Sequence, residues 1–175
     1  MEAGPLGRPA RALEILEALG DQPTRQAIYD RIALYDKTGR HADLVELLLA
    51  QSEATSDDKE REGRRVQAAL FLEQRLGEAD RALELYREVL EVNPASYAAI
   101  HGTGRILHGL GRWGDLVRLH HHELTIAPER PDTAVLLSRV GRILEVQLGN
   151  AGAAIGAYAK ALKRVMRKHA GSLRR

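Results

Sequence analysis

Apolar side chains recur three and four positions apart along most of the chain, which is the spacing that places them on one face of an α-helix. Alanine and leucine, both strong helix formers, dominate these positions, and β-branched residues never form a run. We therefore expect an all-α protein of about nine helices. They lie near residues 9–19, 24–38, 40–53, 59–76, 78–92, 95–109, 112–126, 132–147 and 151–169.

Four glycines each follow one apolar segment and precede the next: Gly39, Gly77, Gly111 and Gly149. The interval from each glycine to the next is nearly constant, and it is long enough for two helices and two short turns. Glycine adopts the left-handed conformation of a tight turn at little cost. We therefore expect each glycine to join the two helices of a hairpin.

The sequence also matches itself across two of these intervals. Residues 34–47 align with residues 106–119, and residues 76–86 align with residues 148–158, in the same register. Pro94 and Pro128 lie equally far beyond Gly77 and Gly111, where a proline ends the second helix of the unit. The chain is therefore a helical repeat protein.

The second helices of these units resemble the tetratricopeptide repeat (TPR) family. The matching positions are Ala82, Tyr86, Val89, Leu90 and Pro94; then Leu116, His120, Leu124 and Pro128; then Ala154, Tyr158, Ala161 and Leu162. Gly104 fills the small-residue position of a first helix. The resemblance implies a right-handed α-solenoid of helix-turn-helix (TPR-like) repeats. It also implies that the small residues let paired helices approach closely and that the aromatic residue packs against the next repeat.

This reading divides the chain into a flexible segment 1–8, a single array 9–169 and a basic tail 170–175. The array comprises a half repeat at 9–22 and four repeats at about 23–56, 57–94, 95–130 and 131–169. The leading helix has the pattern of a second helix without its first helix. We therefore expect either a fragment of a longer array or a first helix that meets another chain.

Composition narrows the class of protein further. The chain has no cysteine, which excludes disulfides and thiolate metal sites, and it lacks both a signal peptide and an apolar run of about 18 residues. We therefore expect a soluble, cytoplasmic protein without a membrane span. Arginine outnumbers lysine 21 to 5, which is typical of a GC-rich bacterial genome. Residues 142–175 hold eight basic residues and one acid, although the net charge of the whole chain is only +2.

No pattern in the sequence predicts catalysis or a cofactor. Gly102 and Gly104 lie inside a helical segment and do not form a phosphate-binding loop, and no serine lies in a nucleophile motif. His120, His121 and His122 point about 100° apart on a helix, so they cannot converge on one metal ion. We expect no enzyme, no cofactor and no metal site, with His120 packed between helices.

In TPR proteins the first helix of each pair lines a concave surface. Counting back from the turn glycines gives these candidates for binding a protein partner: Gln26, Tyr29, Asp36, Arg64, Gln67, Phe71, Gln74, His101, Arg105, His108 and Arg139. Arginine binds carboxylates bidentately, which favours an extended, acidic peptide or a partner helix in this groove. Replacing Arg105 and Arg139 with glutamate is then expected to abolish capture of the partner.

We therefore expect a non-catalytic scaffold for protein–protein interaction. Two alternatives stay open at this point. The array can position the catalytic part of a larger enzyme or complex, or its basic C-terminal end can contact nucleic acid, although no aromatic stacking residues accompany those charges. Trp113 at the start of a second helix packs across its pair or forms a partner contact. Pairing of two copies through the ends of the array also stays open.

Overall fold

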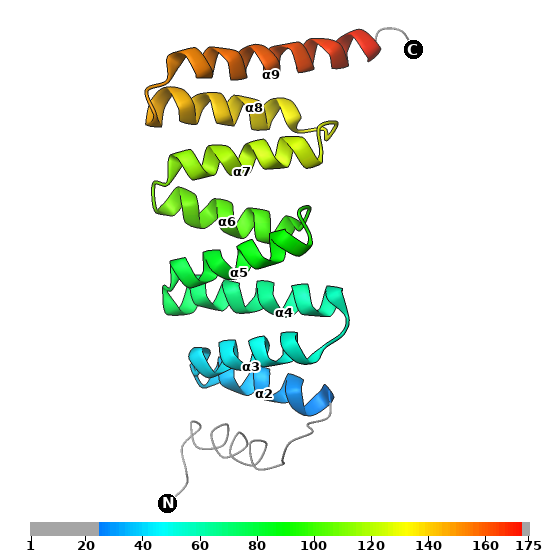
Figure 1. Cartoon of the computed structure of the whole chain (residues 1–175), viewed down its shortest axis with the longest axis vertical. Helices are drawn as coiled ribbons and strands as arrows, with labels where there is room; N and C mark the ends of the chain where they lie inside the picture. The colour runs from blue at the N-terminus through cyan, green and yellow to red at the C-terminus, as the bar shows by residue number, and fades with distance from the viewer. Residues whose placement is uncertain (1–24, 173–175) are drawn as a thin grey trace, which may run out of the picture. The chain divides into compact units, whose positions relative to one another are not determined.

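The computed structural model describes residues 25–172, all of which form helices or the short connections between them (Figure 1). The segment 1–8, the half repeat 9–22 and residues 173–175 lie outside the described residues. The described elements are α2 (Arg25–Lys37), α3 (His41–Ala54), α4 (Asp58–Phe71), η1 (Leu72–Leu76), α5 (Ala79–Val92), α6 (Tyr97–Gly109), α7 (Trp113–Ile126), α8 (Thr133–Arg142), η2 (Ile143–Gln147) and α9 (Ala151–Ser172). The prediction of an all-α repeat fold is confirmed, and every described helix lies within a few residues of its expected bounds.

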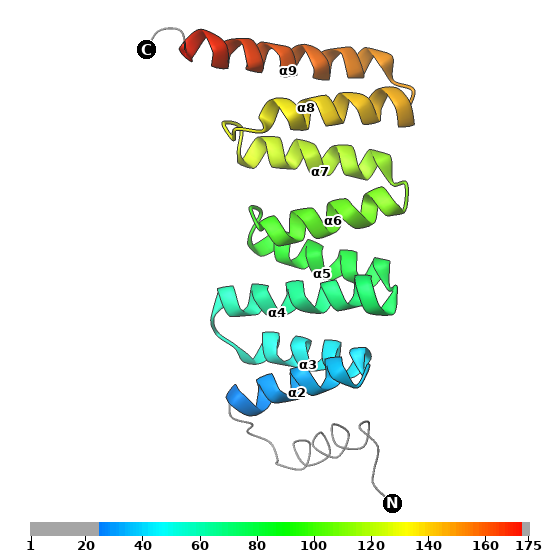
Figure 2. The same cartoon turned by 180° about the vertical axis from the view of Figure 1, so that it is seen from behind.

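The chain divides into two compact units, with the boundary after Val89. In the first unit α3 packs against α2, against α4 and against η1. In the second unit α6 packs against α7, and α8 packs against both α7 and α9 (Figures 1 and 2). Consecutive helices within each unit run in opposite directions, as the short turns between them require.

The four turn glycines are the only described residues with positive φ, at 72°, 71°, 66° and 62° along the chain. This confirms the role that their spacing predicts. At Gly149 a Cβ atom would have nothing within 4 Å, so the need for glycine there comes from the backbone conformation alone.

Replacing Gly149 with alanine is therefore expected to lower the free energy of unfolding by about 1–2 kcal/mol. Gly156 is the matched control because it also has open space around it but lies inside α9, where alanine is the better helix former by about 1 kcal/mol. Urea denaturation followed by circular dichroism measures both variants. Equal effects of the two substitutions would contradict a conformational role for Gly149.

The turns are of two alternating kinds. After α2 and α6 the residue following the turn glycine donates its amide hydrogen bond five residues back, at 2.9 Å, from Arg40 to Tyr35 and from Arg112 to Leu107. After α4 and α8 the helix first widens into the π-helical segments η1 and η2. The bond there reaches six residues back, from Glu78 to Leu72 and from Asn150 to Leu144. Successive hairpins therefore have different ends. This explains why the sequence matches itself at an interval of two hairpins and not of one.

Small residues let the helices of a pair approach closely, as the family resemblance implies. Ala82 and Ala154 are buried at equivalent positions of α5 and α9. On α8, Gly141 lies against the ring of Tyr158, so close that a Cβ atom there would be 2.7 Å from the ring. The hydroxyl of Tyr158 donates to Oε2 of Glu145 at 2.8 Å, which fixes the ring over the glycine.

Candidate functional site

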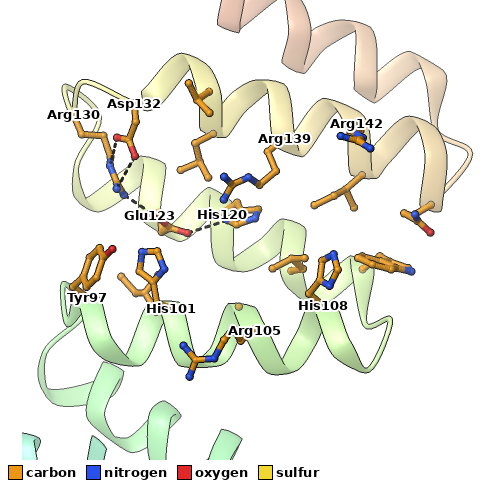
Figure 3. A pocket seen from close by; sticks show the side chains of 18 of the residues that line it. Tyr97, His101, Arg105, His108, His120, Glu123, Arg130, Asp132, Arg139 and Arg142 are labelled. Atoms are coloured by element: carbon orange, nitrogen blue, oxygen red, sulfur yellow. Dashed lines mark hydrogen bonds and ion pairs between the residues drawn. The ribbon is translucent and has the colours of Figure 1, made fainter. Parts of the chain in front are cut away.

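A cavity of about 720 Å³ lies in the second unit, between α6, α7 and α8 (Figure 3). The first helices of two successive pairs, α6 and α8, form its sides, and α7 lies between them. The loop after α7 closes one end with Arg130 and Asp132. The cavity has the size of a site for a small ligand or for a few side chains of a peptide.

Four of the residues predicted from the sequence line this cavity: His101, Arg105 and His108 from α6, and Arg139 from α8. All four are exposed. The structure therefore brings the candidates of two neighbouring repeats together, because the first helices of the two pairs present the same face to the cavity.

Aromatic rings stand at both ends of α6. The imidazole of His101 lies over Tyr97 with ring centroids 4.0 Å apart, and His108 meets Trp113 edge-on with centroids 5.0 Å apart. Trp113 thus packs across its helix pair and also lines the cavity. These rings provide flat apolar surfaces beside the charged groups, an arrangement that suits a side chain with both apolar and charged parts.

A buried polar network forms the end of the cavity beside the loop. Glu123 is 6% exposed, accepts from Nδ1 of His120 at 2.9 Å and accepts from Arg130 at 3.0 Å. Arg130 also donates twice to Asp132, at 2.6 and 2.9 Å (Figure 3). Both acids that line the cavity are therefore already paired with a cation of the chain itself.

The remaining charges of the cavity are positive. Arg139 and Arg142 project from α8 one turn apart, and both are exposed. Among residues 26–167, neither guanidinium forms an ion pair with a carboxylate. The cavity therefore presents two cations to a ligand while its carboxylates are occupied, which favours an anionic group as the occupant.

The network also makes stability depend on pH. Burial alone raises the pKa of Glu123, but the hydrogen bond from His120 and the charges of His120 and Arg130 outweigh it and hold that pKa below its ordinary value of 4.5. A depressed pKa in the folded state means that the carboxylate stabilises the fold above about pH 4.5. This contribution is lost as the pH falls through the pKa of the folded state.

Replacing Glu123 with glutamine is therefore expected to lower the free energy of unfolding by about 1–2 kcal/mol at pH 7, because the charge-assisted hydrogen bonds weaken. The difference from the unaltered protein is expected to shrink below pH 4. Thermal melting from pH 7 to pH 3 measures this, with Glu84→Gln at an exposed position of α5 as the control. A difference that does not change with pH would contradict the assignment.

The other seven candidates lie in the first unit. Arg64 of α4 stacks over the ring of Tyr29 from α2, with 5.3 Å between the guanidinium carbon and the ring centroid. His41 contacts both Asp36, at 3.5 Å, and Phe71, at 5.9 Å between ring centroids. Gln26 and Gln74 are exposed, and Gln67 is half-buried. Arg64 and Tyr29 thus contact each other directly, whereas Asp36 and Phe71 both contact His41.

Reasoning from the sequence offered Trp113 as a partner contact but missed other residues of the cavity. The missed charged and aromatic residues are Tyr97 and Arg142 on the first helices, and His120, Glu123, Arg130 and Asp132 on α7 and the loop after it. Arg142 could have been found, since it lies one turn beyond Arg139. The buried position of His120 was expected, but no sequence signal pairs it with Glu123 and Arg130, because that pairing depends on how the loop after α7 folds back.

Neither a cluster of metal ligands nor a helix that could cross a membrane occurs among the described residues. No three His, Asp or Glu side chains in the described part of the chain gather closely enough to hold a metal ion. Between residues 25 and 172, no helix combines the length and the apolar character that a bilayer crossing requires.

Comparisons with known proteins identify the fold. No protein-family model and no curated protein matches the chain. Among solved structures, MamA AMB-1 has 23% sequence identity and a TM-score of 0.53, over 90% of this chain and 89% of that chain. MamA MSR-1 has 24% identity and a TM-score of 0.52, over 93% and 90%. A mutant of MamA has 23% identity and a TM-score of 0.56, over 91% and 85%. At these identities the likeness concerns the fold alone.

Proposed function

We propose that this chain is a non-catalytic protein-binding scaffold and that the cavity of its second unit holds an acidic segment of a partner protein. The observation that carries this proposal is the pair Arg139 and Arg142, which form no ion pair with a carboxylate among the described side chains and line a cavity whose own acids are paired with Arg130. A carboxylate that enters the cavity gains bidentate hydrogen bonds without displacing an existing ion pair.

The shape of the site favours an extended peptide over a compact ligand. The cavity follows the space between α6 and α8, and His101 and His108 stand two helical turns apart along one side. Successive side chains of an extended segment can therefore meet Tyr97 and His101 at one end and Trp113 at the other. The rings contribute apolar contact, and the arginines select for charge.

A selection experiment tests this function directly. A random peptide library displayed on phage is selected on the full chain, and the enriched peptides are synthesised. We expect enrichment of aspartate and glutamate, and we expect binding to change the fluorescence of Trp113, which is the only tryptophan of the chain and lines the cavity. Binding is expected to weaken as salt rises, because the contacts are electrostatic and partly exposed.

Replacing Arg139 and Arg142 with glutamate is expected to lower the affinity for the enriched peptides by roughly tenfold or more, because each charge attraction becomes a repulsion. Arg118→Glu is the matched control, since Arg118 is an exposed arginine of α7 that does not line the cavity. Enriched peptides that are not acidic, or that bind the double variant unchanged, would reject the site. An oligonucleotide that binds more tightly than the peptides would favour the nucleic-acid alternative instead.

A further inference from the structure

The last helix, α9, carries an open apolar face. Ile155, Leu162 and Met166 are 69%, 61% and 64% exposed, and their spacing of seven and four residues aligns them in one row. The opposite side of the same helix buries Ala154, Ala157 and Ala161. α9 is therefore apolar both on the side that packs within the second unit and on a side that faces solvent.

Counting from the turn glycines identifies the residues of the other hairpins that are equivalent to this row. Ile155 and Leu162 hold fixed positions relative to the turn glycine Gly149. The pairs at the same positions are Val45 and Ser52 after Gly39, Leu83 and Leu90 after Gly77, and Val117 and Leu124 after Gly111. Of these six residues three are buried, and Leu83, Leu90 and Leu124 are half-buried.

In the hairpins after Gly39 and Gly111 the next first helix packs against the second helix: α4 packs on α3, and α8 packs on α7. The same two positions are exposed on α9. The open row is thus the face on which a repeat array receives its next helix. An apolar row there marks an interaction surface.

The charge of α9 indicates which kind of helix fits. The helix contains no acidic residue, and Lys160, Lys163 and Arg167 are exposed. At about 100° per residue, Lys163 lies next to the apolar row and Arg167 lies beyond it on the same side. A second copy of α9 would bring two basic helices together, which is electrostatically unfavourable, whereas acidic residues on the covering helix would be attracted.

We propose that the open face of α9 binds one acidic amphipathic helix of a partner protein. Its apolar side packs on Ile155, Leu162 and Met166, and its acidic residues lie opposite Lys163 and Arg167. This helix takes the place beside α9 that α8 takes beside α7. The surface is separate from the proposed peptide site, because none of these residues lines the cavity between α6 and α8.

Two synthetic peptides with the same apolar row serve as probes. Both have the sequence of residues 132–147, which covers α7 in this chain. One carries Arg139→Glu and Arg142→Glu and is acidic, and the other carries Asp132→Lys and Glu145→Lys and is basic. Binding of each labelled peptide to the full chain is measured by fluorescence anisotropy. We expect the acidic peptide to bind at least about tenfold more tightly than the basic one.

Variants of α9 then separate the apolar and the charged contributions. Leu162→Asp and Ile155→Asp are each expected to lower the affinity for the acidic peptide by at least about tenfold. Both substitutions replace exposed residues, so the fold is expected to be retained. The pair Lys163→Glu and Arg167→Glu is expected to reverse the preference in favour of the basic peptide. All these measurements are repeated on a protein with Arg139→Gln and Arg142→Gln, which removes the two cations on which the cavity proposal rests. The preference for the acidic peptide and the effects of the α9 variants are expected to persist there, so this test does not depend on the cavity proposal.

Four outcomes would overturn the proposal. Equal binding of the two peptides, or binding that Leu162→Asp and Ile155→Asp leave unchanged, excludes a charge-selected helix on this face. Dimers in sedimentation velocity that Leu162→Asp dissociates assign the face to a second copy of the chain. Binding to phosphatidylserine vesicles that exceeds binding to the acidic peptide assigns the face to a lipid surface.

Discussion

Replacing Gly141 with alanine is expected to lower the free energy of unfolding of the second unit by about 1–3 kcal/mol, the range for overpacked cores. A Cβ atom at this position would lie 2.7 Å from the ring of Tyr158, closer than real side chains approach. The ring can move away only by breaking the hydrogen bond of its hydroxyl to Glu145, and otherwise α8 and α9 must separate. Urea denaturation followed by circular dichroism measures the loss.

Two further variants show whether the contact with Tyr158 causes this loss of stability. Gly104→Ala is the matched control, since Gly104 also lies in a first helix against a second helix, but its Cβ atom would be 3.5 Å from Leu119, an ordinary contact distance. It is expected to change stability little. In a protein with Tyr158→Leu, the further change Gly141→Ala is expected to cost much less than it does alone. Equal costs in both backgrounds would contradict the proposed clash.

Replacing Leu72 with alanine is expected to destabilise the first unit by about 3–5 kcal/mol, the upper part of the range measured for leucine-to-alanine changes in protein cores. Leu72 is 0% exposed and begins the π-helical segment at the end of α4, where it packs among buried residues of the hairpin. Its removal leaves a cavity that the surrounding helices can fill only in part. Urea denaturation at constant temperature measures the change.

Leu70→Ala is the control for this substitution, because Leu70 lies two residues earlier and is 36% exposed. It is expected to cost less than about 1 kcal/mol, since alanine is also the better helix former. Similar losses from the two variants would show that the helix end, and not the packing of Leu72, sets the stability of the unit.

The positions of the described helices could be predicted from the sequence because glycine adopts the positive φ that a tight turn requires. Spacing alone places Gly39, Gly77, Gly111 and Gly149 at turns, and each has the expected positive φ. The widening of α4 and α8 into η1 and η2 was not predicted, because the apolar pattern is the same in an α-helix and in one wider turn. α9 also continues to Ser172, three residues beyond its expected end.

The candidate site was predicted in part. Counting along first helices selects Arg105 and Arg139, and both line the cavity of the second unit. The same count cannot find Glu123 and Arg130, because it takes no account of second helices or loops. It also treats all repeats alike, although in the first unit the candidate Arg64 of α4 stacks on the candidate Tyr29 of α2.

The alternation of turn types determines how many hairpins must be added at once to lengthen this fold in the same pattern. A hairpin with a tight end, as after α2 and α6, is each time followed along the chain by one with a π-widened end, as after α4 and α8. A designed chain lengthened by one hairpin of each kind would keep this order. Insertion of a single hairpin would bring two like ends into succession. Arrays built from this sequence are therefore expected to extend in pairs of hairpins.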